Sequence, residues 1–169
     1  MESTALEQLL NDRSKNWWFG GFVSIPLNEL VVVLYQQTVG KPETVDIAGH
    51  AFDGLMPVTI NQTLPYLEIQ FEGVVGFQSI IESFYGSDKS EKRADAEPSQ
   101  YQYPLYNVFT NSKYLAYISS IENGTLSLFD NDNRVYQIIT ADHIIEVVTA
   151  TPPTYKWVND EKNSLVQLR

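Results

Sequence analysis

The sequence predicts a mainly β fold: a single domain built on a curved antiparallel sheet, barrel-like or sandwich-like, with one helix at its N-terminal end. Short runs rich in Val, Ile, Tyr, Phe and Trp recur along the chain, and Gly, Pro, Asn and Asp separate them. Such runs suit a pleated, half-buried surface, and a barrel or sandwich would protect the sheet edges. An α+β fold is the alternative. We expect the domain to span 1–158, with 159–169 as a flexible tail.

The N-terminal helix is expected over residues 4–12. Thr4 and Glu7 fit a capping box, in which the two side chains satisfy backbone N–H groups at the start of a helix. Leu6, Leu9 and Leu10 fall on one helical face. Because this apolar stripe is narrow, we expect the helix to lie against the sheet as a brace.

The first strand is expected at Trp17–Ile25, and the pair of glycines inside it predicts a bulge or a sharp bend. Leu27–Gln37 is ambiguous, since its leucines have helical spacing whereas its three consecutive valines favour a strand. We expect a strand, because Trp17–Ile25 needs an antiparallel partner.

The middle of the chain alternates between breakers and strands. Thr38–Pro57 contains five Gly and Pro residues and is predicted to be a loop. A short strand is expected at Val58–Ile60, a half-buried antiparallel strand at Tyr66–Glu72, and another strand at Phe77–Tyr85. The charged stretch 86–100 is predicted to be a mobile loop.

The C-terminal part, Tyr114–Ala150, is predicted to be an antiparallel meander of four short strands. Asn123-Gly124 supports this, because both residues accept the positive φ angles of a two-residue hairpin turn. Tyr155–Val158, after two prolines, is expected to add an edge strand.

Composition excludes some classes of function. The formal net charge is -10, which argues against nucleic acid and against an anionic membrane surface, since both are bound by clustered Lys and Arg. A basic protein partner, or a neutral or cationic ligand, is permitted. The sequence contains no cysteine, no apolar stretch of transmembrane length and no secretion signal at its N-terminus. We therefore expect a cytoplasmic protein.

Motifs that carry known chemistries are absent from the sequence. There is no phosphate-binding loop, no dinucleotide fingerprint, no His-Glu-x-x-His and no nucleophile elbow. We therefore predict no cofactor and no metal. The spacing of Asp46, His50 and Asp53 is a weak exception, since carboxylates and histidine ligate metals.

Two glutamates interrupt apolar strand faces and form a candidate pocket. Glu82 would share its face with Ile80 and Phe84. Glu146 would likewise share its face with Ile144 and Val148. A carboxylate on an inward face must be paired, hydrogen-bonded or protonated, and general acid-base chemistry uses such groups. We expect each glutamate to be structural, on an outer face or paired with an Arg such as Arg134. The alternative is that Glu82, Glu146 and His143 line one pocket.

Aromatic residues form a candidate interaction surface. Trp17 and Trp18 are adjacent in a predicted strand, so they should point to opposite sides of the sheet. One exposed Trp would mark a contact surface, and Tyr101 and Tyr103 raise the same question. The alternative is that these rings fill a core.

Two functions remain open from the sequence. The first, which we favour, is a non-enzymatic acidic module that binds a protein partner or forms a homo-oligomer. The second is a small-molecule-binding barrel or a carboxylate-dependent enzyme whose pocket contains Glu82, Glu146 and His143. A closed lumen would favour the second, and a core filled by side chains would favour the first.

Overall fold

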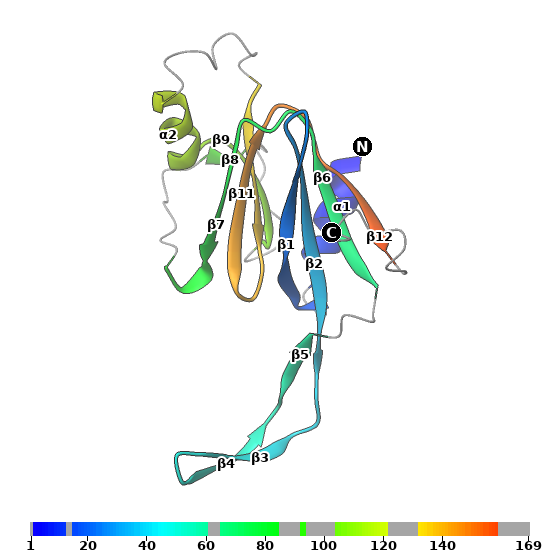
Figure 1. Ribbon diagram of the computed structural model, residues 1–169, viewed down its shortest axis with the longest axis vertical. Helices are drawn as coiled ribbons and strands as arrows, with labels where there is room; N and C mark the ends of the chain where they lie inside the picture. Colours follow the sequence, from blue (N-terminus) through cyan, green and yellow to red (C-terminus); the bar gives the residue numbers. More distant parts are fainter. Residues whose placement is uncertain are drawn as a thin grey trace.

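Two antiparallel sheets that face each other form the body of the molecule (Figure 1). The computed structural model describes residues 2–12, 15–60, 65–84, 92–93, 104–121 and 132–158. The predicted mainly β, antiparallel fold is confirmed. Over these residues the sheets do not close into a barrel, so the arrangement is that of a sandwich with open edges.

The first sheet has the strand order β1-β2-β6-β12, and β5 pairs with the far end of β2. All of these pairings are antiparallel. The strands are β1 (Trp17–Ile25), β2 (Glu29–Val39), β5 (Val58–Ile60), β6 (Tyr66–Phe71) and β12 (Thr154–Val158).

The second sheet has the order β7-β11-β10-β9-β8, again antiparallel throughout. Its β10–β11 hairpin is the part of the predicted meander that is confirmed. The strands are β7 (Gly76–Ile81), β8 (Lys92–Arg93), β9 (Tyr106–Asn111), β10 (Arg134–Ile139) and β11 (His143–Thr149).

The ambiguous segment Leu27–Gln37 forms most of strand β2, as predicted, and β2 pairs with β1. A register shift between Phe19 and Gly21 is the expected bulge. Residues 30–34 are buried on both faces of the sheet. A strand covered on both sides contains a continuous apolar run instead of an alternating one, which explains why its periodicity was ambiguous.

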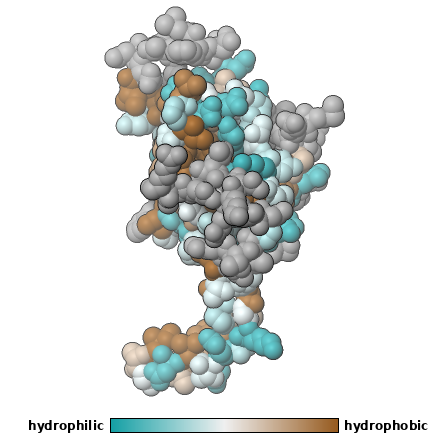
Figure 2. Space-filling view, turned by 45° about the vertical axis from the view of Figure 1, so that its right-hand side comes forward, coloured by the Kyte–Doolittle hydropathy of each residue, from teal (hydrophilic) through white to brown (hydrophobic). Residues whose placement is uncertain are grey.

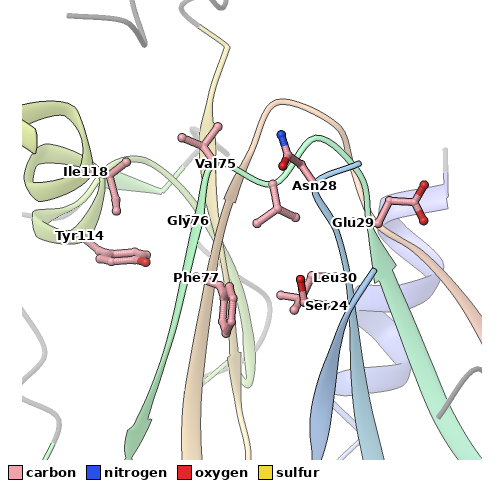
Figure 3. Close-up of a pocket in the computed structure, with 10 residues that line it drawn as sticks. Ser24, Asn28, Glu29, Leu30, Val75, Gly76, Phe77, Tyr114 and Ile118 are labelled. Carbon is pink, nitrogen blue, oxygen red and sulfur yellow. The ribbon is translucent and has the colours of Figure 1, made fainter. Parts of the chain in front are cut away.

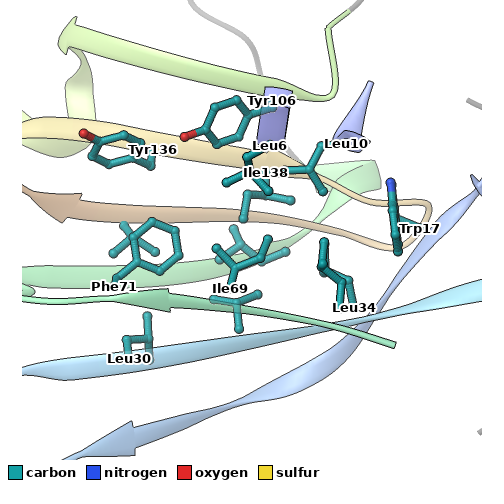
Figure 4. Packing of buried hydrophobic residues seen from close by; sticks show 14 residues of the cluster. Leu6, Leu10, Trp17, Leu30, Leu34, Ile69, Phe71, Tyr106, Tyr136 and Ile138 are labelled. Atoms are coloured by element: carbon teal, nitrogen blue, oxygen red, sulfur yellow. The ribbon is translucent and has the colours of Figure 1, made fainter. Parts of the chain in front are cut away.

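The core between the two sheets is filled by side chains, and helix α1 (Glu2–Leu10) contributes to it. Leu6 and Leu10, one helical turn apart, are 1% and 0% exposed, so the helix braces the sheets as predicted. The helix begins at Glu2, so Thr4 lies inside it and the predicted capping box is wrong. Figure 4 shows side chains of β2 and β6 facing those of β9 and β10, among them Leu30, Ile69, Phe71, Tyr106 and Tyr136.

The prediction of a loop over Thr38–Pro57 is wrong. Strand β2 continues to Val39, and β3 (Glu43–Ile47) and β4 (His50–Leu55) form a hairpin that precedes β5. We call residues 39–60 the arm, because they project away from the sandwich (Figure 1). Its strands escaped the prediction because five Gly and Pro residues interrupt this stretch and favoured a loop.

The first part of the predicted meander is also wrong, since Lys113–Ile121 forms helix α2. The hydroxyl of Ser112 accepts a hydrogen bond from the backbone N–H of Leu115 at 3.0 Å, which is an N-cap. Tyr114 and Ile118, four residues apart, are the buried side chains of the helix. The capping serine and the helical spacing of the buried residues therefore outweigh the β propensity of the tyrosines and isoleucines in this segment.

Strand β7 ends at Ile81, and a short 3-10 helix (Glu82–Phe84) follows in place of the predicted continuation to Tyr85. Within the predicted loop 86–100, Lys92–Arg93 pairs with β9 as strand β8. The rest of that loop, the predicted turn at Asn123-Gly124 and the tail 159–169 lie outside the described residues.

Candidate functional site

Glu146 lies on the face of the second sheet that packs against α2, and it belongs to a row of polar side chains. The amide of Gln137 donates to Glu146 Oε1 at 2.8 Å, and the amide of Gln78 donates to Oε2. Asn107 continues the row by donating to Gln137 Oε1 at 3.0 Å. The four residues stand directly opposite one another on β7, β11, β10 and β9. Two amide donors satisfy the buried carboxylate, so its role here is structural.

The predicted pocket of Glu82, Glu146 and His143 does not form. Glu82 is exposed on the 3-10 helix, because β7 has already ended, whereas Glu146 is 2% exposed. Glu146 and His143 are three positions apart on β11 and therefore point to opposite faces of the sheet. The buried Glu146 therefore lies apart from His143, and Glu82 is exposed where β7 ends, with its backbone N–H donating to the carbonyl of Asp142 at 3.0 Å.

His143 belongs to a clasp that holds the edge strand β1. Asp142 Oδ1 accepts the backbone N–H of Phe19 at 3.0 Å, and its Oδ2 lies 2.7 Å from His143 Nδ1. The backbone N–H of Ala141 donates to the carbonyl of Trp17 at 2.9 Å. The β10–β11 turn therefore satisfies backbone groups at the end of β1 that an edge strand would otherwise expose.

The two tryptophans form no exposed aromatic surface. Trp17 is 2% exposed and lies in the core, with its ring centroid 5.8 Å from that of Trp157, while Trp18 is half-buried. Trp157 is the most exposed of the three tryptophans, at 38%. Tyr101 and Tyr103 lie outside the described residues.

The arm carries the most exposed apolar surface of the part of the chain described by the structure. Seven of the thirteen exposed large hydrophobic side chains found there belong to it. Figure 2 shows hydrophobic residues gathered at the end of the arm. The seven are Val39, Ile47, Phe52, Leu55, Met56, Val58 and Ile60.

The β3–β4 hairpin has one apolar face and one polar face. Val45 stands opposite Phe52, and Ile47 stands opposite His50, so these four side chains share a face. Ile47 is 54% exposed and Phe52 is 47% exposed. We call this the apolar face of the arm. Sequence reasoning missed it; the signal in the sequence is the alternation of Val45 and Ile47 with polar residues. The turn that follows, Ala48-Gly49, has positive φ angles of 54° and 85°.

Two of the acidic residues of the arm accept hydrogen bonds that stabilise the hairpin. Asp46 Oδ1 accepts the backbone N–H of Gly49 at 2.9 Å, and Asp53 Oδ1 accepts the hydroxyl of Thr44 at 2.6 Å. These bonds engage Asp46 and Asp53, two of the three residues whose spacing suggested a metal. Over the described ranges, no three or more His, Cys, Asp or Glu residues gather in a way that could hold a metal ion.

Comparison with known proteins finds no relative: no family model, curated protein or solved structure matches the chain. None of the helices in the described segments has the length and apolar character needed to span a membrane.

Proposed function

We propose that the protein is a non-enzymatic, acidic and cytoplasmic interaction module that binds a partner protein through the apolar face of the arm. The observation that supports this most strongly is the exposure of Ile47 and Phe52 on a projecting hairpin. Every residue of β4 is exposed. An isolated two-stranded hairpin is marginally stable in water, and exposed apolar patches on soluble proteins mark contact sites. A partner would bury what the chain itself leaves in solvent.

Charge indicates the kind of partner. The arm contains the acidic residues Glu43, Asp46 and Asp53 against one lysine and no arginine, and the whole chain has a formal net charge of -10. Carboxylates beside an apolar patch complement basic residues beside an apolar groove, and such complementarity raises the association rate. A second copy of the chain would bring like charges together. We therefore infer a basic protein partner.

Two observations speak against the alternative of a ligand-binding barrel or an enzyme centred on Glu82, Glu146 and His143. The space between the sheets is filled by apolar side chains. Glu146 and His143 point to opposite faces of β11, Glu82 is exposed, and the buried carboxylate of Glu146 already accepts two amide hydrogen bonds. An acid-base catalyst needs a group within hydrogen-bond reach of its substrate.

The test is affinity capture from the cells that make the protein, using the wild type and two variants. Ile47→Asp combined with Phe52→Asp removes the apolar face, and Leu27→Asp is the matched control, since Leu27 is 88% exposed on the body. We expect the wild type and the control to retain one basic protein in stoichiometric amount, and the double variant to lose it. With that partner purified, Phe52→Ala should weaken binding about tenfold, because buried aromatic anchors dominate interface energies.

Equal capture by the double variant and the wild type would contradict the proposal. Sedimentation of the purified wild type gives the other decisive result. A homo-oligomer that Ile47→Asp with Phe52→Asp dissolves and Leu27→Asp preserves would replace the basic partner with a second copy.

A further inference from the structure

A cavity of about 360 Å³ lies at one open edge of the sandwich, at the end of β2 that is opposite to the arm. It is enclosed by the β1–β2 turn, the start of β7 and helix α2 (Figure 3). This volume falls in the range of small-molecule sites, which are concave, mostly apolar and contain few polar groups. The residues that matter for its chemistry are Ser24, Asn28, Val75, Phe77, Tyr114 and Ile118.

Backbone hydrogen bonds hold the walls of the cavity in place. The N–H of Val74 donates to the carbonyl of Asn28 at 2.8 Å, and the N–H of Val75 donates to the carbonyl of Val148 at 2.9 Å. Gly76 lets helix α2 approach, because a Cβ there would lie 2.9 Å from Ile118 Cδ1 and 3.2 Å from the Tyr114 hydroxyl oxygen. The cavity is therefore preformed.

Tyr114 supplies a hydroxyl group to the wall of the cavity. Its side chain is 9% exposed, and its hydroxyl makes no hydrogen bond within the part of the chain that the structure describes. Figure 3 shows the hydroxyl directed from α2 toward Gly76, at the wall of the cavity. Because Tyr114 lines the cavity, an acceptor that enters from solvent can reach this hydroxyl and take its hydrogen bond. Burial, with the Glu146 carboxylate adding to it, raises the pKa of Tyr114 to about 12, so the group remains a donor.

The walls determine the rest of the ligand. Val75, Phe77 and Ile118 offer an apolar surface, while Ser24 and Asn28 offer polar groups on the side of the β1–β2 turn. Glu29 also borders the cavity, but its carboxylate accepts a hydrogen bond from Gln70 at 3.1 Å and points away in Figure 3. The formal net charge of -10 disfavours anions.

We propose that this cavity binds a small uncharged molecule with an apolar body and a carbonyl-type acceptor, which the Tyr114 hydroxyl bonds while Val75, Phe77 and Ile118 enclose the body. The site is separate from the apolar face of the arm and does not depend on the function proposed for it.

The test compares three small probes by NMR titration of the backbone amides: acetophenone, ethylbenzene as its isostere without an acceptor, and benzoate as the anion of similar size. Acetophenone should shift the amides of 74–77 and 114–118 with a dissociation constant roughly in the millimolar range, as expected for so few atoms. Benzoate should not bind. Tyr114→Phe should weaken acetophenone about fivefold and leave ethylbenzene unchanged, because only the hydrogen bond is lost.

Three controls keep the test decisive. Unchanged ethylbenzene binding by Tyr114→Phe shows that the cavity survives the substitution. Ser24→Phe, at an exposed position on the cavity wall, should block both neutral probes, and Phe52→Asp on the arm should affect neither. Shifts that map elsewhere, benzoate binding as tight as acetophenone binding, or no loss of acetophenone affinity in Tyr114→Phe would each overturn the proposal.

Discussion

The body and the arm contain the same kinds of apolar strand residues, but the body buries them and the arm leaves them exposed to solvent. In the sandwich, Phe71 and Leu34 are 0% exposed. On the arm, Phe52 and Ile47 are 47% and 54% exposed. Apolar side chains in the body stabilise the fold by leaving water, whereas those of the arm remain in water until something else covers them. The difference separates residues that maintain the fold from residues available for binding.

The largest difference in the free energy of unfolding is expected between two variants, one that removes a ring from the body and one that removes a ring from the arm. Phe71→Ala empties a position between the sheets, where the ring lies 5.9 Å from Tyr136, and should lower the free energy of unfolding by about 3–5 kcal/mol. Phe52→Ala should change it by less than about 0.5 kcal/mol. Urea denaturation of both variants measures the two values. A large loss for Phe52→Ala would mean that the arm packs on the body and is not a free surface.

The two glutamates that look alike in the sequence allow a second comparison. Glu146→Ala leaves the amides of Gln78 and Gln137 without their acceptor inside the sheet, and should lower the free energy of unfolding by about 2–4 kcal/mol. Glu82→Ala, at an exposed position, should be within about 0.5 kcal/mol of the wild type. Equal effects in thermal or urea unfolding would contradict the structural role given to the polar row.

The clasp on β1 should have an intermediate effect. Asp142→Ala removes the acceptor of the Phe19 N–H and of the Thr140 hydroxyl, and should destabilise the protein by about 1–2 kcal/mol. Asp142→Asn keeps an acceptor oxygen and is the matched control. Hydrogen exchange should show faster opening of β1 in the alanine variant than in the asparagine variant. Identical exchange at β1 in the two variants would argue against a clasp.

The smallest effect concerns pH. The pKa of Tyr114 is raised from 10.0 to about 12, so the unfolded chain loses this proton before the folded protein does. Its contribution is complete below pH 10 and declines as the pH rises toward 12. Tyr114→Phe should therefore lose stability less steeply over this window, while Tyr136, whose pKa burial also raises, contributes equally to both proteins. Parallel stability curves for the two proteins would contradict the shift.

The elements that the sequence predicts well are those whose local signals agree with their surroundings. The bulge in β1, strand β2 and the β10–β11 hairpin belong to this group. Burial of both faces explains why residues 30–34 carry a continuous apolar run, and the sandwich core supplies one of the two covers.

The arm and the placement of the glutamates depend on information that is not local. Val45 and Ile47 alternate with polar residues, but the Gly and Pro residues around them favoured a loop, and only the pairing of β3 with β4 brings Phe52 to the same face. Glu82 and Glu146 both interrupt apolar runs, but β7 ends one residue before Glu82, and Gln78 and Gln137 meet Glu146 only through strand pairing. The cavity beside Tyr114 likewise needs α2, β7 and the β1–β2 turn to come together.

Hydrogen exchange of the arm tests the central claim most directly. The protein would be isolated gently from its own cells, and its exchange would be compared before and after its partner is removed with salt, which weakens contacts between opposite charges. We predict that the amides of residues 43–55 exchange rapidly in the free protein and are protected in the complex, while the sandwich strands change little. Protection of the arm in the free protein, or equal exchange of residues 43–55 in both samples, would contradict the assignment of the arm as the binding surface.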